Sequence, residues 1–364
     1  MSLDAQQIRQ RILPHYVPTM QCESASLTPL GNGHINHTWL LRTDTSALVL
    51  QRINTQVFPK PWAVVENADL IAQHLQQQQQ AGRYALQLTV PVATLSGQLA
   101  IEDTELGFWR AISLVDNSHS IEQMHNTAQA HQTAAAFGAF AAALADFDAS
   151  QLQATISDFR NLDVRMRLLE QQVNADRHGR VAECRPWLAF VASQRILLTE
   201  VADMEAQLPL RICHNDTKIN NLLFDAGNNP CAVVDLDTCM AGYWMYDFGD
   251  MVRSCCASVA EDSTELQNIN LLPDYFTAIS QGWLQALGPL MTPVEHDSLW
   301  LGVKVVTLML AIRFLTDHLD GDRYFRITHS GHNLQRAINQ FTLYQRLLEQ
   351  QHQLQPILMA TSSK

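Results

Sequence analysis

The chain has 364 residues, of which 47% are hydrophobic, and its formal net charge at pH 7 is −12. This length is more than one hydrophobic core usually serves, and it predicts two lobes or domains. The acidic balance argues against a nucleic-acid partner, because binding to phosphate backbones depends on an excess of lysine and arginine. Lysine occurs only at Lys60, Lys218, Lys304 and Lys364, so chemistry that needs this side chain has few candidates.

The seven cysteines form no C-x-x-C pair, which is typical of buried thiols in a reducing compartment. The N-terminal segment has no apolar stretch of the kind found in secretory signals. Of the two most apolar stretches, 134–147 is too short to span a bilayer and 301–315 contains Lys304 and Arg313. These features predict a cytoplasmic protein without a membrane partner.

In chain order, residues 1–20 predict a helix with Ile8, Ile12 and Leu13 on its apolar face. Two strand-like runs follow from Ser26, and the turn at Asp44-Thr45 between them indicates a β-hairpin. The apolar spacing over about 62–80 predicts a helix, and further strand-like segments complete a small sheet by residue 116.

Beyond residue 116 the pattern becomes mainly helical, with strand-like segments returning only at 211–238. We therefore expect an α+β protein with a β-rich N-terminal lobe over 1–116 and a helical C-terminal lobe over 117–364. The hinge is expected at 114–118.

The most informative motif begins at residue 214 and reads His-x-Asp-x₄-Asn, which places His214, Asp216 and Asn221 at fixed spacing. Asp235 follows directly after a second apolar strand, nineteen positions beyond Asp216. The two strands, at about 221–224 and 231–234, are expected to form a hairpin.

Phosphoryl transfer suits these residue types, because it needs a positioned acceptor hydroxyl and neutralised phosphate oxygens more than covalent help. Asp216 would accept the hydroxyl proton, and Asn221 and Asp235 supply the oxygen ligands that Mg²⁺ prefers. Asp237 is expected to face the same side, either as a further ligand or behind the ligands. Lys218, two residues past Asp216, is placed to neutralise charge during transfer.

The stretch "HNDTKINNLLF…VVDLDT…YDFGD" resembles the aminoglycoside phosphotransferase and choline kinase superfamily, which implies a protein-kinase-like fold that uses ATP and Mg²⁺. The wording "GNGHIN", "LVLQRIN", "FWR" and "RFLTDHLDGDRYF" is similar to bacterial N-acetylhexosamine 1-kinases, over roughly residues 25–350. That resemblance implies a sugar acceptor attacked through its anomeric hydroxyl.

The turn Gly31-Asn-Gly33-His34-Ile-Asn36 lies between two strands. A tight hairpin explains such a turn when it stands alone, but at the head of a kinase-like lobe we expect its backbone to approach nucleotide phosphates. The resemblance also places the nucleotide against the hinge residues Leu114 and Asp116.

The third strand lacks the lysine that protein kinases use to hold phosphates and offers Gln51 and Arg52 instead. Strand alternation points these two side chains to opposite faces. We expect Arg52 to serve, with Glu66 as its partner, although a solvated helix carboxylate explains Glu66 equally well.

Acceptor-binding candidates are Arg110, Arg253, Arg313 and Asp317. A buried ion pair four residues apart on one helix is the alternative for Arg313 and Asp317. The letters D-F-G at 247–249, which mark a magnesium ligand in protein kinases, lie thirty-one residues beyond Asp216 and too far along the chain for that role. We expect Asp247 to brace the catalytic loop, and Asp250 to be a carboxylate at a helix start.

Three alternatives remain from the residues. The first is a kinase for another small alcohol, such as an aminoglycoside, choline or homoserine. The second is a phosphatase of the haloacid dehalogenase type, in which the D-x-D of "VVDLDTC" would supply the nucleophile. The third is an inactive kinase-like binding module.

Overall fold

The structure is a computed structural model that describes residues 5–31 and 35–361. The chain divides into two compact units. The first unit contains Met1–His119, Ser150–Ser157 and Leu223–Met240, and the second contains Ser120–Ala149, Asp158–Leu222 and Ala241–Lys364. The segment Leu223–Met240, which carries Asp235 and Asp237, thus belongs to the same unit as the N-terminal sheet.

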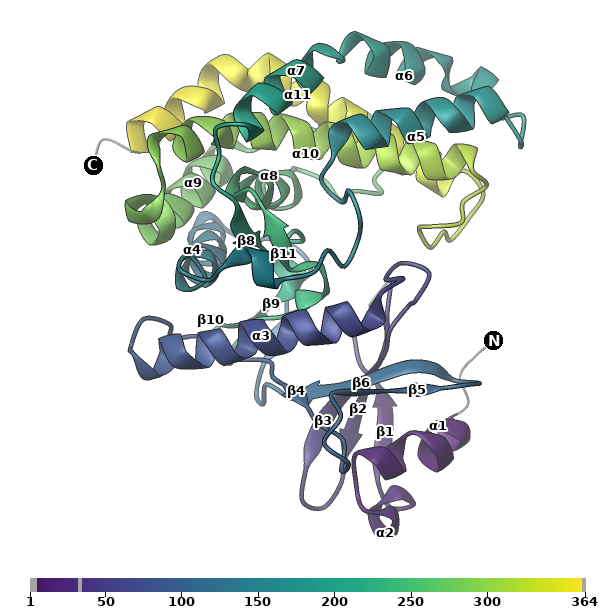
Figure 1. Cartoon of the computed structure of the whole chain (residues 1–364). Coiled ribbons are helices and arrows are strands. Elements are labelled where there is room, and N and C mark those ends of the chain that lie inside the picture. The colour runs from purple at the N-terminus through teal and green to yellow at the C-terminus, as the bar shows by residue number, and fades with distance from the viewer. Residues whose placement is uncertain (1–4, 32–34, 362–364) are drawn as a thin grey trace. The chain divides into compact units, whose positions relative to one another are not determined.

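The first unit is built on an antiparallel sheet in the order β1-β2-β3-β6-β4, with β5 also pairing with β6 (Figure 1). The predicted hairpin is confirmed, because β2 and β3 pair from His37↔Arg52 to Arg42↔Ala47 across the turn at 43–46. The strands are β1 (Ser26–Pro29), β2 (His37–Arg42), β3 (Ala47–Arg52), β4 (Pro91–Val92), β5 (Ala100–Asp103) and β6 (Gly107–Ser113).

The two faces of this sheet bury different side chains. On one face, Trp39, Leu50 and Trp109 pack with Ile8 and Ile12 of the N-terminal segment. The other face packs Phe108 against residues of α3 (Pro61–Gln80), the helix that the apolar spacing predicted. Because side chains alternate along a strand, each residue of β3 and β6 can be assigned to one of these faces.

The N-terminal segment is not the single helix that we expected. It consists of α1 (Ala5–Arg11), a 3₁₀ turn η1 (Leu13–His15) and a short α2 (Thr19–Cys22). Pro14 and Pro18 account for the breaks, since proline lacks the N–H that continues a helix and restricts the residue before it. The three expected apolar residues are nevertheless fully buried.

The segment Leu223–Met240 carries the second predicted hairpin. β9 (Leu222–Phe224) lies between β10 (Pro230–Val233) and β7 (His119–Ser120) in a three-stranded sheet. The Asp225 side chain accepts the backbone N–H groups of Gly227 and Asn229, both at 2.8 Å, and so closes the turn. After β10 the chain enters the 3₁₀ turn η4 (Leu236–Thr238).

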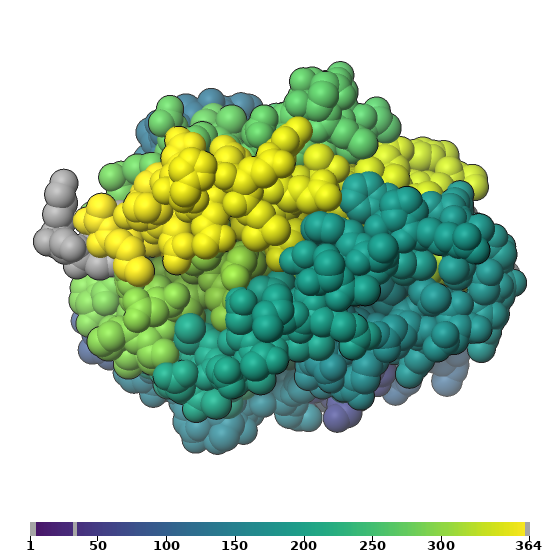
Figure 2. All heavy atoms as spheres, turned by 90° about the horizontal axis from the view of Figure 1, so that it is seen from above, coloured from purple at the N-terminus to yellow at the C-terminus, as the bar shows by residue number. Residues whose placement is uncertain are grey.

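The second unit is mainly helical, with α10 at its centre and Val305, Leu308 and Ile312 among the fully buried residues of its core. Figure 2 shows the face on which α11 lies beside the segment that carries α5 to α7. The helices are α4 (Thr127–Ala143), α5 (Leu162–Ala175), α6 (Val181–Ser193), α7 (Ile196–Glu205), α8 (Trp244–Cys255), α9 (Pro273–Leu287), α10 (Pro293–Leu319) and α11 (His332–Thr361). The shorter elements are β8 (Arg211–Cys213), which pairs with β11 (Met240–Gly242), and the 3₁₀ turns η2 (Ala149–Gln151), η3 (Ile219–Asn221), η5 (Leu266–Asn268) and η6 (Gly288–Leu290).

Glycines set the spacing between the helices of this unit. A Cβ added to Gly249 of α8 would overlap with the backbone carbonyl of Gly302 on α10, and one added to Gly302 would overlap with the carbonyl of Met245. The backbones of α8 and α10 are therefore in direct contact. Among the described residues, α10 is also the one helix long and apolar enough to cross a membrane, yet 78% of its most apolar window is buried inside the protein.

Candidate active site

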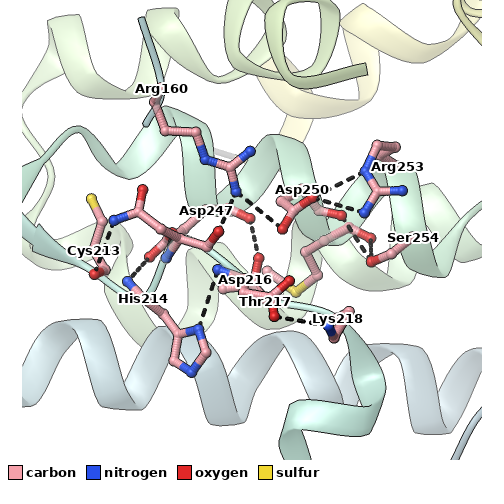
Figure 3. A network of polar contacts seen from close by, with 12 residues as sticks. Arg160, Cys213, His214, Asp216, Thr217, Lys218, Asp247, Asp250, Arg253 and Ser254 are labelled. Carbon is pink, nitrogen blue, oxygen red and sulfur yellow. Dashed lines mark hydrogen bonds and ion pairs between the residues drawn. The ribbon is translucent and has the colours of Figure 1, made fainter. Parts of the chain in front are cut away.

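The loop that follows β8 is held by one buried carboxylate. Asp247 on α8 accepts the backbone N–H groups of His214 and Asn215, each at 2.7 Å, and its own carbonyl accepts the Thr217 hydroxyl at 2.6 Å (Figure 3). Burial raises the pKa of Asp247, although His214 and the two N–H groups favour its anion. The expectation that Asp247 braces this loop is confirmed, because both of its carboxylate oxygens accept backbone N–H groups of the loop.

Asp216 is the residue that this loop presents. Its side chain is 26% exposed, and one of its oxygens lies 2.8 Å from Lys218 Nζ and accepts Asn221 Nδ2 at 2.7 Å. Burial works against ionisation, but the Lys218 charge and the hydrogen bonds outweigh it and lower the pKa of Asp216 to about 2. The carboxylate is therefore an anion at physiological pH, which is the form that can accept a proton.

Asn221 has the orientation that an oxygen ligand needs. Its amide nitrogen donates to the Asp216 carbonyl at 2.8 Å and to the Asp216 carboxylate, so its carbonyl oxygen is the atom that a cation would meet. A hard ion such as Mg²⁺ binds amide and carboxylate oxygens. In the first unit, Asp235 is exposed and adopts the left-handed conformation, with φ 62°. Such backbone conformations cluster at functional sites when the residue is not glycine.

Asp237 is placed very differently from Asp235, because its side chain is only 1% exposed. One carboxylate oxygen accepts the guanidinium of Arg110 on β6, and the other accepts Asn36 Nδ2 at 2.6 Å. Asn36 in turn accepts the backbone N–H of Asn54 at 2.9 Å. With both oxygens engaged inside the protein, Asp237 fits a position behind the metal ligands better than a ligand role.

The arginine of the third strand lies on the other face of the sheet from Asp237. Arg52 pairs with Trp109, and the two side chains share the face that packs against the N-terminal segment. Its guanidinium lies over Gly107, where an added Cβ would be 3.3 Å from Nε. The expected partner, Glu66, is exposed and accepts Gln153 Nε2 at 2.7 Å instead. The structure does not bring Arg52 and Glu66 together.

Gly31, Leu114 and Asp116, three further nucleotide-site candidates of the first unit, lie outside its strands. Gly31 is exposed and has φ 71°, a conformation that favours glycine. Leu114 directly follows β6, and Asp116 begins an exposed turn. Gly33 and His34 lie outside the described residues.

Arg253, one of the acceptor-site candidates, is engaged in structural contacts. Arg253 is buried and contacts Asp250 at 2.9 Å and Glu261 at 2.8 Å; burial lowers the pKa of Arg253, but these carboxylates more than compensate and raise it. Asp250 lies in the middle of α8 and also contacts Arg160 at 3.2 Å, so the expectation of a helix-start carboxylate is wrong (Figure 3). Helix α8 begins six residues earlier, at Trp244.

Asp317 is likewise structural. It accepts the backbone N–H groups of Arg323, Tyr324 and Phe325 at 2.8–2.9 Å and Asn333 Nδ2 at 2.8 Å, which folds the segment after α10 back onto the helix. These bonds, and not the ion pair with Arg313 that the spacing allowed, occupy its carboxylate.

Arg313 faces aromatic rings. Its guanidinium lies 5.1 Å from the Phe159 ring and 5.4 Å from the Tyr324 ring, and it donates to the Tyr324 hydroxyl at 3.2 Å. Burial lowers the pKa of Arg313, and the nearby charge of Arg160 lowers it further.

Sequence reasoning missed Arg160, whose guanidinium donates to the Asn215 carbonyl beside Asp216. It stands before α5 in a segment without any motif, so no signal in the sequence could have indicated this role. Arg165, in the first turns of α5, was missed for the same reason. Burial and the charge of Arg313 lower its pKa to about 10.

The His-x-Asp-x₄-Asn spacing of this braced loop matches the residue pattern of phosphoryl-transfer sites. Residues 26–286 match the model of the "Phosphotransferase enzyme family", and the chain belongs to this family.

Solved structures with low sequence identity share the fold, which is protein-kinase-like. A microcompartment-associated aminopropanol kinase is 15% identical with a TM-score of 0.60, and the match covers 95% of this chain and 98% of that one. The ethanolamine kinase of Plasmodium vivax is 12% identical with a TM-score of 0.59, covering 93% and 87%. The GDP complex of an aminoglycoside 2'-phosphotransferase is 13% identical with a TM-score of 0.56, covering 92% and 96%.

Proposed function

We propose that this protein is an ATP-dependent kinase that transfers the γ-phosphoryl group to a hydroxyl of a sugar, most specifically the anomeric hydroxyl of an N-acetylhexosamine. The observation that carries the kinase proposal is the Asp216 carboxylate, which Lys218 and Asn221 hold as an anion on a loop braced by Asp247. The family assignment supports the same class of reaction and gives no support to a phosphatase.

In the proposed reaction, Asp216 accepts the proton of the acceptor hydroxyl while the oxygen of that hydroxyl forms a bond to the γ-phosphorus. The bond between the γ-phosphorus and the bridging oxygen breaks, and ADP leaves with that oxygen. Lys218 contacts Asp216 in the free enzyme, and its ammonium group is placed to stabilise the negative charge of the transferred group.

Asn221 and Asp235 are the proposed ligands of Mg²⁺, which when bound would neutralise phosphate charge. The chemistry of these donors fits the ion, because both side chains offer oxygen atoms. Asp237 is proposed to support the metal ligands without binding the ion, because its carboxylate holds Arg110 and Asn36.

The charges of the second unit favour an uncharged acceptor. Burial lowers the pKa of Arg165 and Arg313, and neighbouring guanidinium charges lower both further. Arg160 bonds directly beside Asp216. A cationic acceptor such as choline, ethanolamine or an aminoglycoside would be repelled by this group of guanidinium ions, whereas sugar hydroxyls can accept hydrogen bonds from it. Tyr324, beside Arg313, offers a ring on which a sugar face can stack.

A substrate screen by mass spectrometry tests the proposal. The purified full-length protein would be incubated with ATP and Mg²⁺ and one candidate at a time: N-acetylglucosamine, N-acetylgalactosamine, galactose, glucose, choline, ethanolamine, homoserine and an aminoglycoside. We expect an N-acetylhexosamine to gain one phosphoryl group, and the Asp216→Asn variant to give none.

The outcomes separate the two parts of the proposal. Phosphorylation of a cationic acceptor alone would overturn the sugar assignment and leave the kinase intact. ATP consumption without any acceptor dependence would contradict both. Loss of the phosphate from the product at low pH, as for an anomeric phosphate, would identify the anomeric hydroxyl as the one phosphorylated. We propose that the reaction takes place in the cytoplasm, as the sequence suggested.

A further inference from the structure

We propose that Arg110 on β6 is the cation that holds the nucleotide phosphates, in the place of the lysine that the third strand lacks. This inference rests on the proposed kinase function and adds the residue that would bind ATP through its phosphates. It reassigns Arg110, which the sequence suggested as an acceptor ligand.

The register of the sheet carries the first step. Gln51, one of the two β3 residues that could stand in the place of the lysine, pairs with Arg110 on the neighbouring strand. Side chains of such a pair lie on the same face of a sheet. Gln51 Oε1 accepts Arg110 Nε at 2.9 Å, so the neutral residue on β3 orients a cation that comes from β6.

The second step concerns the face. Arg110 contacts Asp237, two residues after Asp235, on the face of the sheet that packs against α3. Arg52 lies on the opposite face with Trp109. Within the described part of the first unit, Arg110 is thus the strand arginine that reaches the segment carrying Asp235.

The third step is the donor count of the guanidinium. Arginine carries five N–H groups in a planar fork. Hydrogen bonds to the described residues engage Nε with Gln51 and one Nη2 hydrogen with Asp237. The remaining donors suit phosphate oxygens, which arginine binds in pairs.

Burial explains why the cation needs Asp237 when no nucleotide is bound. The Arg110 side chain is only 4% exposed, and a buried charge without a partner is strongly destabilising. Asp237 supplies that partner, and Asn36 holds Asp237 in turn. Asp237 is therefore a positioning residue for Arg110.

The test compares the binding of ATP, ADP and adenosine to the full-length protein by calorimetry. A phosphate ligand affects ATP and ADP but not adenosine. We expect Arg110→Met to reduce the preference for ATP over adenosine by about 10- to 100-fold, as for a lost charge-assisted hydrogen bond, while adenosine binds as before. Arg42→Met, an exposed arginine of β2, is the matched control.

Arg52→Met tests the competing assignment and should leave the ATP preference unchanged. The inference is overturned if Arg52→Met lowers that preference, if Arg110→Met does not, or if Arg110→Met weakens all three ligands equally, as a purely structural ion pair would. If wild-type protein binds none of the nucleotides, the proposed kinase function itself fails.

Arg110→Met leaves Asp237 without its partner and can impair folding, so Arg110→Lys provides a second measurement. Lysine keeps the charge but loses the planar fork. We expect a folded protein, verified by thermal unfolding, whose preference for ATP is reduced by about three- to tenfold. An unchanged preference in this variant would contradict the assignment.

Discussion

Lys218 Nζ lies 2.8 Å from a carboxylate oxygen of Asp216, two residues earlier in the same loop. In the proposed reaction Asp216 is the base and Lys218 supplies the charge that keeps it ionised, so the two are linked in the expected pH dependence. The pKa of Asp216, lowered to about 2, places its protonation far below neutral pH.

We therefore expect kcat/KM of the wild-type enzyme to show no acid limb from Asp216 above about pH 5. Removing the ammonium group in Lys218→Met raises the pKa of the carboxyl, so activity should be lost at a higher pH on the acid side. The maximal rate should also fall by about 10²- to 10³-fold, as for other lost electrostatic stabilisers. A pH–rate profile checks both effects, with Lys60→Met at an exposed position as the control. An unchanged profile in Lys218→Met would contradict the assigned role.

Asp247→Ala should cost stability first. The substitution leaves the backbone N–H groups of His214 and Asn215 without their acceptor inside the protein, at about 1–3 kcal/mol for each unsatisfied group. The free energy of unfolding, measured in urea, should fall by the cost of the unsatisfied N–H groups, about 1–3 kcal/mol for each. Activity measured at a temperature where the variant is still folded should fall as well, because the loop carrying Asp216 loses its brace.

Asp235→Asn should have the opposite signature. The side chain is exposed, and asparagine tolerates the left-handed backbone at this position, so stability should fall by less than in Asp247→Ala. Mg²⁺-dependent turnover should be abolished. Equal losses of stability in Asp235→Asn and Asp247→Ala, or turnover retained in Asp235→Asn, would mean that the two aspartates have been assigned the wrong roles.

Gly302→Ala should destabilise the second unit by about 1–3 kcal/mol, because the new methyl group meets the backbone carbonyl of Met245 and can be accommodated only if α8 and α10 separate. Gly288→Ala is the matched control, since its new methyl group would come no closer than 3.8 Å to Leu284. Urea unfolding midpoints of the two variants provide the comparison. Similar midpoints would show that the interface between α8 and α10 adapts easily.

The local parts of this protein could be predicted from the sequence, and the parts that depend on distant pairing could not. The spacing of His214, Asp216 and Asn221 indicated the loop that we propose as catalytic, because all three lie within eight residues. The helix at Pro61–Gln80 was likewise evident from its apolar period.

Arg110 and Asp237 show why the rest escaped prediction. Their contact joins positions 127 residues apart, and it depends on how β3 and β6 align. Strand alternation showed that Gln51 and Arg52 face opposite ways but not which face the aspartates approach. The partners of Asp317 escaped prediction for a similar reason, since they come from a loop that folds back after α10.

Helix α8 carries three unrelated contacts within four residues: Asp247 holds the loop with Asp216, Gly249 touches α10, and Asp250 binds two arginines. One residue inserted or deleted here would turn the following part of the helix by about 100°, since an α-helix has about 3.6 residues per turn. After such a rotation the three contacts cannot all be kept together. This segment should therefore accept changes of side chain at some positions but no change of length, unlike the exposed turn at 225–229.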